Sequence, residues 1–180
     1  MIEEFKTPIY IFDTEVLTAR INTIKQKISE TATLCYAVKA NPFIISYAEP
    51  LVERLEVCSE GEFEICESAN APMEKIVVSG VYKTPAFIER IVSQYENIGV
   101  YTIESIAHYE LLKELAKKYS KRLPVLIRIT SKNQFGVSEK DLEKILKDNP
   151  TEFLDIRGLQ FFSSTQKNSV KKFRRELTYL

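Results

Sequence analysis

The sequence contains few of the residues that mark several common classes of protein. It has one histidine, His108, and three cysteines, Cys35, Cys58 and Cys66. An odd number of cysteines without close pairing indicates reduced, buried thiols in a cytoplasmic protein. His108 lies in a predicted helix, where we expect it on the surface, so a zinc site has almost no ligands available and we expect no metal.

The sequence also lacks an excess of charge and a long apolar run. Its 25 Lys and Arg residues balance 25 Asp and Glu residues, whereas nucleic-acid-binding proteins usually carry a basic excess. No apolar run approaches the ~20 residues that a membrane helix needs, and the opening MIEEFKTP has no signal-peptide character. We therefore expect a cytoplasmic protein that binds neither nucleic acid nor membrane.

Glycine is scarce as well, and its placement excludes one common cofactor site. The five glycines are isolated, at Gly61, Gly80, Gly99, Gly136 and Gly158. No Gly-x-Gly-x-x-Gly motif and no Gly-Gly pair is present. The sequence therefore gives no support to a dinucleotide site of the Rossmann type.

What is present is a regular alternation of short apolar runs and helical patterns. After a short strand candidate at 8–12, Asp13 can cap a first helix, and six strand–helix repeats follow. Thr84, Ser105 and Ser138 are candidate caps of later helices. The predicted strands of the six repeats are 33–40, 55–59, 75–80, 98–103, 124–130 and 154–164.

This alternation predicts an α/β fold with parallel strands, because each strand is a short apolar run that helices would cover on both faces. Either an open doubly wound sheet or a (β/α)8 barrel has this pattern. A complete barrel needs eight strands and typically ~250 residues, so six repeats would form only part of one. We expect an N-terminal strand segment over 1–13 and a truncated barrel domain over 14–180.

A lysine ends the first of these strands, in the stretch LCYAVKANP. In a barrel, functional side chains lie at the C-terminal ends of the strands, where Lys39 is. Burial would lower the pKa of its ammonium group toward the range in which a lysine is a nucleophile that forms Schiff bases. On position alone, a lysine that extends its charge into solvent is the commoner case.

The residues around Lys39 favour the cofactor-binding interpretation over that of a solvent-exposed lysine without a function. YAVKANP resembles the cofactor-lysine motif of the fold-type III pyridoxal-phosphate-dependent decarboxylases, which include diaminopimelate, ornithine/arginine and carboxynorspermidine decarboxylases. Other segments resemble the family's motifs in the right order: TPIYIFD, LEVCSEGEFE, IVVSGVYKT, VYTIES, VLIRI, NQFGV and IRGLQFFSSTQ. The resemblance covers essentially all 180 residues. It implies a partial (β/α)8 barrel of the alanine racemase/decarboxylase type.

The resemblance also implies roles for five residues. Lys39 would be the catalytic residue that binds pyridoxal 5'-phosphate (PLP) as an internal aldimine, and Glu56 would stand near the cofactor. Arg128 would belong to the polar network beside the ring, Phe162 would stack on the ring, and Thr165 would contact the phosphate. Without the resemblance, Glu56 is a rim charge, Arg128 a member of a structural ion pair and Thr165 a helix cap.

Three departures from the family pattern are visible. Gln160 and Phe162 replace the two histidines of the family's H-x-H-I-G-S-Q motif, which weakens any assignment of substrate. Gln134 replaces a lysine that helps the family's dimer complete its active site. The family's glycine-rich phosphate cradle, the acidic partner of the pyridinium nitrogen and the C-terminal β-domain have no counterpart in these 180 residues.

We therefore expect the N-terminal part of a PLP-dependent amino-acid decarboxylase, with diaminopimelate decarboxylase of lysine biosynthesis as the best single choice. It would act on a small-molecule amino acid and form a homodimer or swapped oligomer, and the 180-residue chain would be inactive alone. One alternative is an alanine-racemase-like enzyme, although KANPF departs from the K-A-N-A-Y-G of racemases. The other is a non-catalytic homologue that binds or regulates an active decarboxylase.

Overall fold

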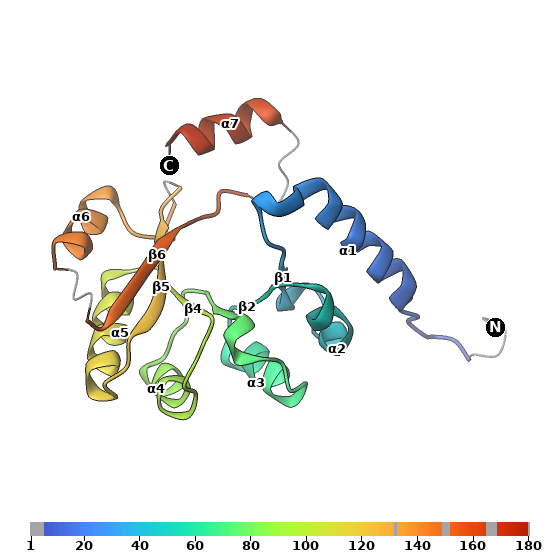
Figure 1. Cartoon of the computed structure of the whole chain (residues 1–180), viewed down its shortest axis with the longest axis horizontal. Coiled ribbons are helices and arrows are strands. Elements are labelled where there is room, and N and C mark those ends of the chain that lie inside the picture. Colours follow the sequence, from blue (N-terminus) through green and yellow to red (C-terminus); the bar gives the residue numbers. More distant parts are fainter. Residues whose placement is uncertain (1–5, 132, 149–151, 165–168, 180) are drawn as a thin grey trace. The chain divides into compact units, whose positions relative to one another are not determined.

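The structure is a computed structural model, and it describes the chain except residues 1–5, 132, 149–151, 165–168 and 180. Six strands form one sheet in sequence order, and every described pairing is parallel (Figure 1). Each strand is followed by a helix, so the six predicted repeats are confirmed. The strands are β1 Cys35–Ala37, β2 Arg54–Val57, β3 Ile76–Val78, β4 Val100–Ile103, β5 Leu123–Ile129 and β6 Leu154–Phe161.

The chain divides into two compact units, Met1–Tyr101 and Thr102–Leu180, and the boundary lies inside β4. The α-helices described in the first unit are α1 Thr14–Ile28, α2 Ile45–Ala48, α3 Glu60–Ser68 and α4 Pro85–Gln94. Its core is aliphatic and aromatic, with Leu55, Phe63, Ile76, Ile88 and Ile91 fully buried. The second unit contains α5 Ile106–Lys118, α6 Glu139–Asp148 and α7 Val170–Tyr179.

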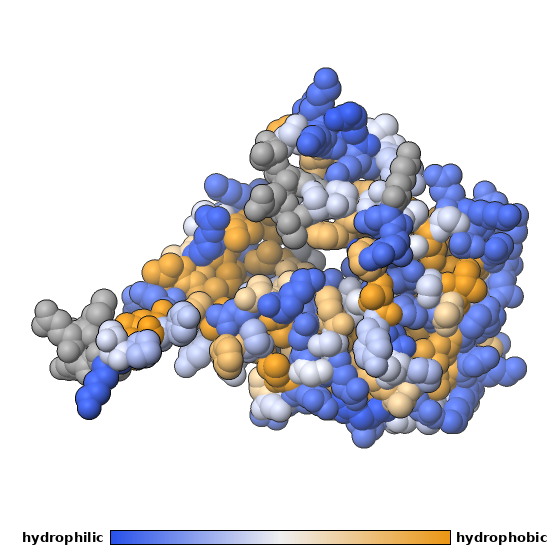
Figure 2. Space-filling view, turned by 180° about the vertical axis from the view of Figure 1, so that it is seen from behind, coloured by the Kyte–Doolittle hydropathy of each residue, from blue (hydrophilic) through white to orange (hydrophobic). Residues whose placement is uncertain are grey.

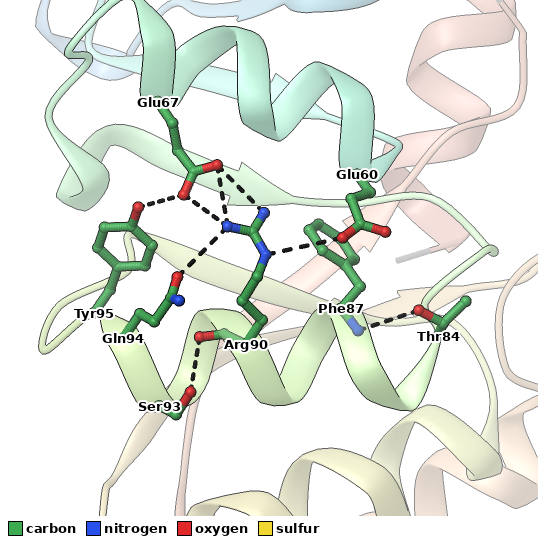
Figure 3. A network of polar contacts seen from close by, with 8 residues as sticks. All are labelled: Glu60, Glu67, Thr84, Phe87, Arg90, Ser93, Gln94 and Tyr95. Atoms are coloured by element: carbon green, nitrogen blue, oxygen red, sulfur yellow. Dashed lines mark hydrogen bonds and ion pairs between the residues drawn. The ribbon is translucent and has the colours of Figure 1, made fainter.

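Helices α3 and α4 are joined through one arginine (Figure 3). Arg90 Nη1 lies 2.9 Å from Glu67 Oε1, and the Tyr95 hydroxyl donates to the same carboxylate. The Arg90 guanidinium also lies over the Phe63 ring, 5.5 Å from its centroid. An aromatic face beside a cation adds attraction to the ion pair, so this arginine fixes how the two helices pack.

The predicted helix starts of the later repeats are confirmed by their caps. The hydroxyl of Thr84 accepts from the Phe87 N–H at 3.2 Å, and Ser105 accepts from the His108 N–H at 3.2 Å. Ser138 accepts from the Asp141 N–H at 3.1 Å and donates to its carboxylate. Each contact satisfies an N–H group that the first turn of a helix leaves without a partner.

The expected strand at 8–12 is wrong. Residues 9–12 lie outside any strand, and Ile9, Tyr10, Ile11 and Phe12 are all exposed. The apolar pattern is that of a strand, but a strand needs a neighbour with which to exchange backbone hydrogen bonds, and no pairing to this segment is described. The following helix α1 buries only Ile21, and apolar surface runs along this segment in Figure 2.

Strand β5 shows alternating burial where we expected an apolar strand covered on both faces. Leu123, Val125, Ile127 and Ile129 are buried, and the residues between them are half-buried. Alternation of this kind is typical of a strand that packs against helices on one face only.

Within the described ranges, no helix is both long enough and apolar enough to cross a membrane.

Candidate functional site

Lys39 lies directly after β1, in a short 3-10 turn over Val38–Ala40. Val38 is completely buried and anchors the turn in the core. The Tyr36 hydroxyl donates to the Asn41 carbonyl oxygen at 3.0 Å and closes the turn from the strand side. Strand β1 is therefore shorter than the predicted 33–40, but the lysine is still placed at its C-terminal end.

The Lys39 ammonium group contacts two side chains of the β2 segment. Its Nζ lies 3.5 Å from Glu56 Oε2 and 3.6 Å from Cys58 Sγ. Parallel pairing of Ala37 with Glu56 brings these groups together. Partial desolvation lowers the pKa of Lys39, but the negative charge of Glu56 and the contact with Cys58 outweigh it, so the pKa is raised above its usual value.

The expectation of a buried lysine with a lowered pKa is therefore wrong. The Lys39 side chain is 59% exposed. β1 lies at one end of the strand order, and its three residues are exposed or half-buried. An apolar sequence around a lysine does not desolvate it when the strand has a neighbour on one side only.

The cysteines differ in burial from one another. Cys35 is exposed, Cys58 is half-buried and Cys66 is buried, and all three are free thiols. The expectation of buried thiols thus holds for Cys66 alone. Burial, followed by the negative charge of Glu56, raises the pKa of the Cys58 thiol.

A second polar cluster is built within Thr102–Leu180. Arg128 on β5 places Nη1 2.6 Å from Glu104 Oε2, and the two side chains are only 12% and 0% exposed. The Thr102 hydroxyl donates to the other carboxylate oxygen at 3.0 Å. Gln160 stands opposite Arg128 in the β5–β6 register, with its amide oxygen buried. Phe135 lies against the guanidinium, 5.3 Å from ring centroid to Cζ.

Glu104 was missed by sequence reasoning, although a signal for it existed. The residue directly follows β4 in the segment TIES, which is where a barrel places functional side chains.

His108 was wrongly expected on the surface. It is buried at 8% exposure, and its Nδ1 accepts from the Glu104 N–H at 3.4 Å, because the first turn of α5 folds back toward the end of β4.

The two remaining predicted residues follow β6. Phe162 comes directly after the strand and is 47% exposed. Thr165 lies outside the described residues. The structure therefore brings Glu56 to Lys39 and pairs Arg128 with Glu104, each within its own unit.

Lys39 and its surroundings fit an aldehyde cofactor. The residue offers an exposed amine beside a carboxylate, and an amine is the group that condenses with an aldehyde. Parallel βα repeats in sequence order, with polar side chains at the strand ends, are the arrangement of a domain of the (β/α) barrel class.

Comparison with known proteins identifies which barrel family this is. The profile described as "Pyridoxal-dependent decarboxylase, pyridoxal binding domain" matches residues 14–179. The chain belongs to this family of pyridoxal-dependent decarboxylases.

Curated relatives span a greater length than this chain. The diaminopimelate decarboxylase of Aquifex aeolicus is 26% identical over 192 residues, covering 97% of this chain and 45% of the relative. The L-glutamyl-[BtrI acyl-carrier protein] decarboxylase of Niallia circulans is 24% identical, covering 99% of this chain and 45% of the relative. The chain thus spans about half the length of the curated relatives it matches.

Solved structures confirm the expected partial barrel. The M. jannaschii diaminopimelate decarboxylase in complex with L-lysine superimposes with a TM-score of 0.76 at 25% identity, covering 95% of this chain and 45% of that one. The lysine/ornithine decarboxylase of Vibrio vulnificus with putrescine gives a TM-score of 0.81 at 20% identity, covering 98% of this chain and 47% of that one. The second likeness is one of fold alone.

Proposed function

We propose that the chain is the N-terminal portion of an enzyme that removes the α-carboxylate of an amino acid with PLP held on Lys39. The observation that carries this proposal is the placement of Lys39. Its amine lies directly after the first strand of a pyridoxal-binding barrel domain, exposed and beside Glu56. When bound, PLP supplies an electron sink for the bond that breaks. The chain itself supplies the amine that attaches the cofactor.

Glu56 has a definite task in this proposal. Its carboxylate, 3.5 Å from Nζ, favours the ammonium form of Lys39, and a Schiff base forms from the neutral amine. Cofactor loading thus requires a proton to leave Nζ, and Glu56 is the nearest described carboxylate to receive it. We propose that Glu56 accepts this proton and holds it while the cofactor is attached.

The remaining contacts to the cofactor are proposed from their positions in the family motifs. Arg128, which Glu104 holds in place, is proposed to belong to the polar network beside the ring, and Phe162, which is 47% exposed, is proposed to stack on it. Thr165 is proposed to contact the phosphate. Because Glu104 fixes Arg128, it is a positioning residue in this scheme.

The proposed substrate is a small amino acid, with a diaminopimelate-like compound as first choice. The curated relatives named diaminopimelate decarboxylase support this choice. The relative from Niallia circulans is named for a glutamyl group on a carrier protein, so a carrier-bound amino acid is the next class to test. We further propose a homodimer located in the cytoplasm, where the three free cysteines stay reduced.

The proposal is tested by trapping the imine. The chain is incubated with PLP, reduced with borohydride and digested, and the pyridoxyl adducts are located by peptide mass mapping. We expect the main adduct on Lys39 and its loss in Lys39→Ala. Lys144 is a matched control, because its side chain is 61% exposed and also ion-paired with a carboxylate. Equal labelling of Lys39 and Lys144 would contradict the proposal and favour a non-catalytic homologue.

A further inference from the structure

A thiol lies beside the amine of Lys39, although the two residues are far apart in the sequence. The Nζ–Sγ distance is 3.6 Å, close to the ~3–3.5 Å separation from which bonds form. Lys39 is exposed and Cys58 is half-buried, so a small oxidant can reach the pair from solvent.

The backbone at Cys58 is held in place. Its N–H donates to Glu62 Oε2 at 2.8 Å. Gly80 packs against it with φ of +87°, and a Cβ at that position would lie only 2.5 Å from the Cys58 carbonyl oxygen. The neighbouring Ser79 N–H donates to the Val57 carbonyl at 2.8 Å. These contacts therefore hold in place the backbone that carries the thiol.

The lysine side of the pair is also anchored. Val38 is fully buried, and the Tyr36 hydroxyl closes the turn onto Asn41. Nζ contacts both the Glu56 carboxylate and Sγ, so a rotation within the long Lys39 side chain is enough to bring Nζ to the sulfur.

We propose that hydrogen peroxide couples Cys58 to Lys39 through a covalent sulfur–nitrogen bond. Peroxide first oxidises the thiol by two electrons to a sulfenic acid, and one water is released as the O–O bond breaks. The Lys39 ammonium group gives one proton to the Glu56 carboxylate, and the Nζ lone pair then attacks Sγ as the S–N bond forms and the S–O bond breaks. The departing hydroxide takes a proton from nitrogen and leaves as a second water. The linked pair has two hydrogen atoms fewer than the separate side chains.

Such a link removes the amine that cofactor attachment needs. This consequence rests on the proposed function, whereas the link itself does not. A thiol reductant attacks Sγ, breaks the S–N bond and returns the free amine and thiol, so the modification is reversible. Oxidation would thereby switch off the loading of PLP without destroying the chain.

The test uses the whole 180-residue chain without cofactor. The protein is treated with hydrogen peroxide, digested, and searched for a peptide pair joined between Lys39 and Cys58 that is lighter by two hydrogen atoms. We expect the pair in wild type, its loss in Cys58→Ala and Cys58→Ser, and its persistence in Cys66→Ala. Circular dichroism checks that each variant is folded, and the two Cys58 variants guard against a defect specific to one of them.

A second measurement connects the link to the cofactor. Samples with and without peroxide receive PLP and borohydride, and we expect peroxide to remove most labelling of Lys39 and dithiothreitol to restore it. If a sulfenic acid is trapped at Cys58 but no joined peptide is found, the proposal is overturned. A link between Lys39 and Cys35 instead of Cys58 also overturns it. If the joined peptide forms while untreated Lys39 takes up no PLP, the cross-link stands and only the proposed function fails.

Discussion

Glu104 and Arg128 form an ion pair in which Arg128 Nη1 lies 2.6 Å from Glu104 Oε2 and none of the Glu104 side chain is exposed. The Thr102 hydroxyl donates to the same carboxylate. A charge removed from water in this way requires its partner, since an unpaired buried carboxylate is costly. The ion pair thus stabilises the second unit, and Glu104 fixes the orientation of Arg128.

Removal of the arginine should destabilise the chain strongly. We expect Arg128→Ala to lower the free energy of unfolding by about 3 kcal/mol, because it leaves the Glu104 carboxylate buried without its partner. The measurement is urea denaturation. The control is Lys147→Ala, whose pair with Glu143 is 81% and 69% exposed. We expect that variant to change stability by less than ~0.5 kcal/mol. Equal losses in both variants would contradict the structure.

Stability should depend on pH through Glu53. The Lys25 ammonium group and the Leu34 N–H, 2.9 Å from Oε2, hold the pKa of Glu53 below its usual value. A carboxyl with a lowered folded-state pKa stabilises the fold above its unfolded pKa, and this contribution is lost as pH falls through the folded pKa.

Glu53→Gln should therefore cost about 1 kcal/mol at neutral pH, a small value because the side chain is 39% exposed and solvent screens the pair. The difference from wild type should shrink progressively below about pH 4. Thermal unfolding at a series of pH values measures it. A difference that stays constant down to pH 2 would mean that ionisation of Glu53 is not responsible.

The 180-residue chain should not decarboxylate amino acids at an enzymatic rate, even with PLP on Lys39. Its relatives are about twice as long, and losing groups that position the scissile bond can remove several kcal/mol of barrier lowering. Release of CO2 from meso-diaminopimelate, ornithine, arginine and lysine measures this, with Lys39→Ala as the control. Turnover that disappears in Lys39→Ala would show that these residues suffice.

The chain should associate with itself. β1 and β6 stand at the two ends of the strand order, and parallel strands with a free side pair readily with other chains. Apolar side chains of α7 are also exposed, Val170 at 69% and Leu177 at 57%. Light scattering over a range of concentrations should report dimers or larger species. A monomer at the highest concentration would contradict this expectation.

The sequence by itself determined the six repeats, the caps at Thr84, Ser105 and Ser138, and the position of Lys39 after the first strand. These features depend on residues within about four positions of one another, where periodicity, cap chemistry and strand length act directly. The family motifs around Lys39 are local in the same sense, so the cofactor amine was visible without a structure.

The tertiary structure alone decided what surrounds each of these residues. Lys39 is exposed because β1 ends the strand order, and the segment 9–12 is not a strand because no described strand pairs with it. His108 is buried and Glu104 is paired with Arg128 because α5 folds back on β4 and β5 supplies the cation. Burial and charge pairing are set by groups that are distant in the sequence. A local sequence pattern does not specify which of those groups will contact a given residue.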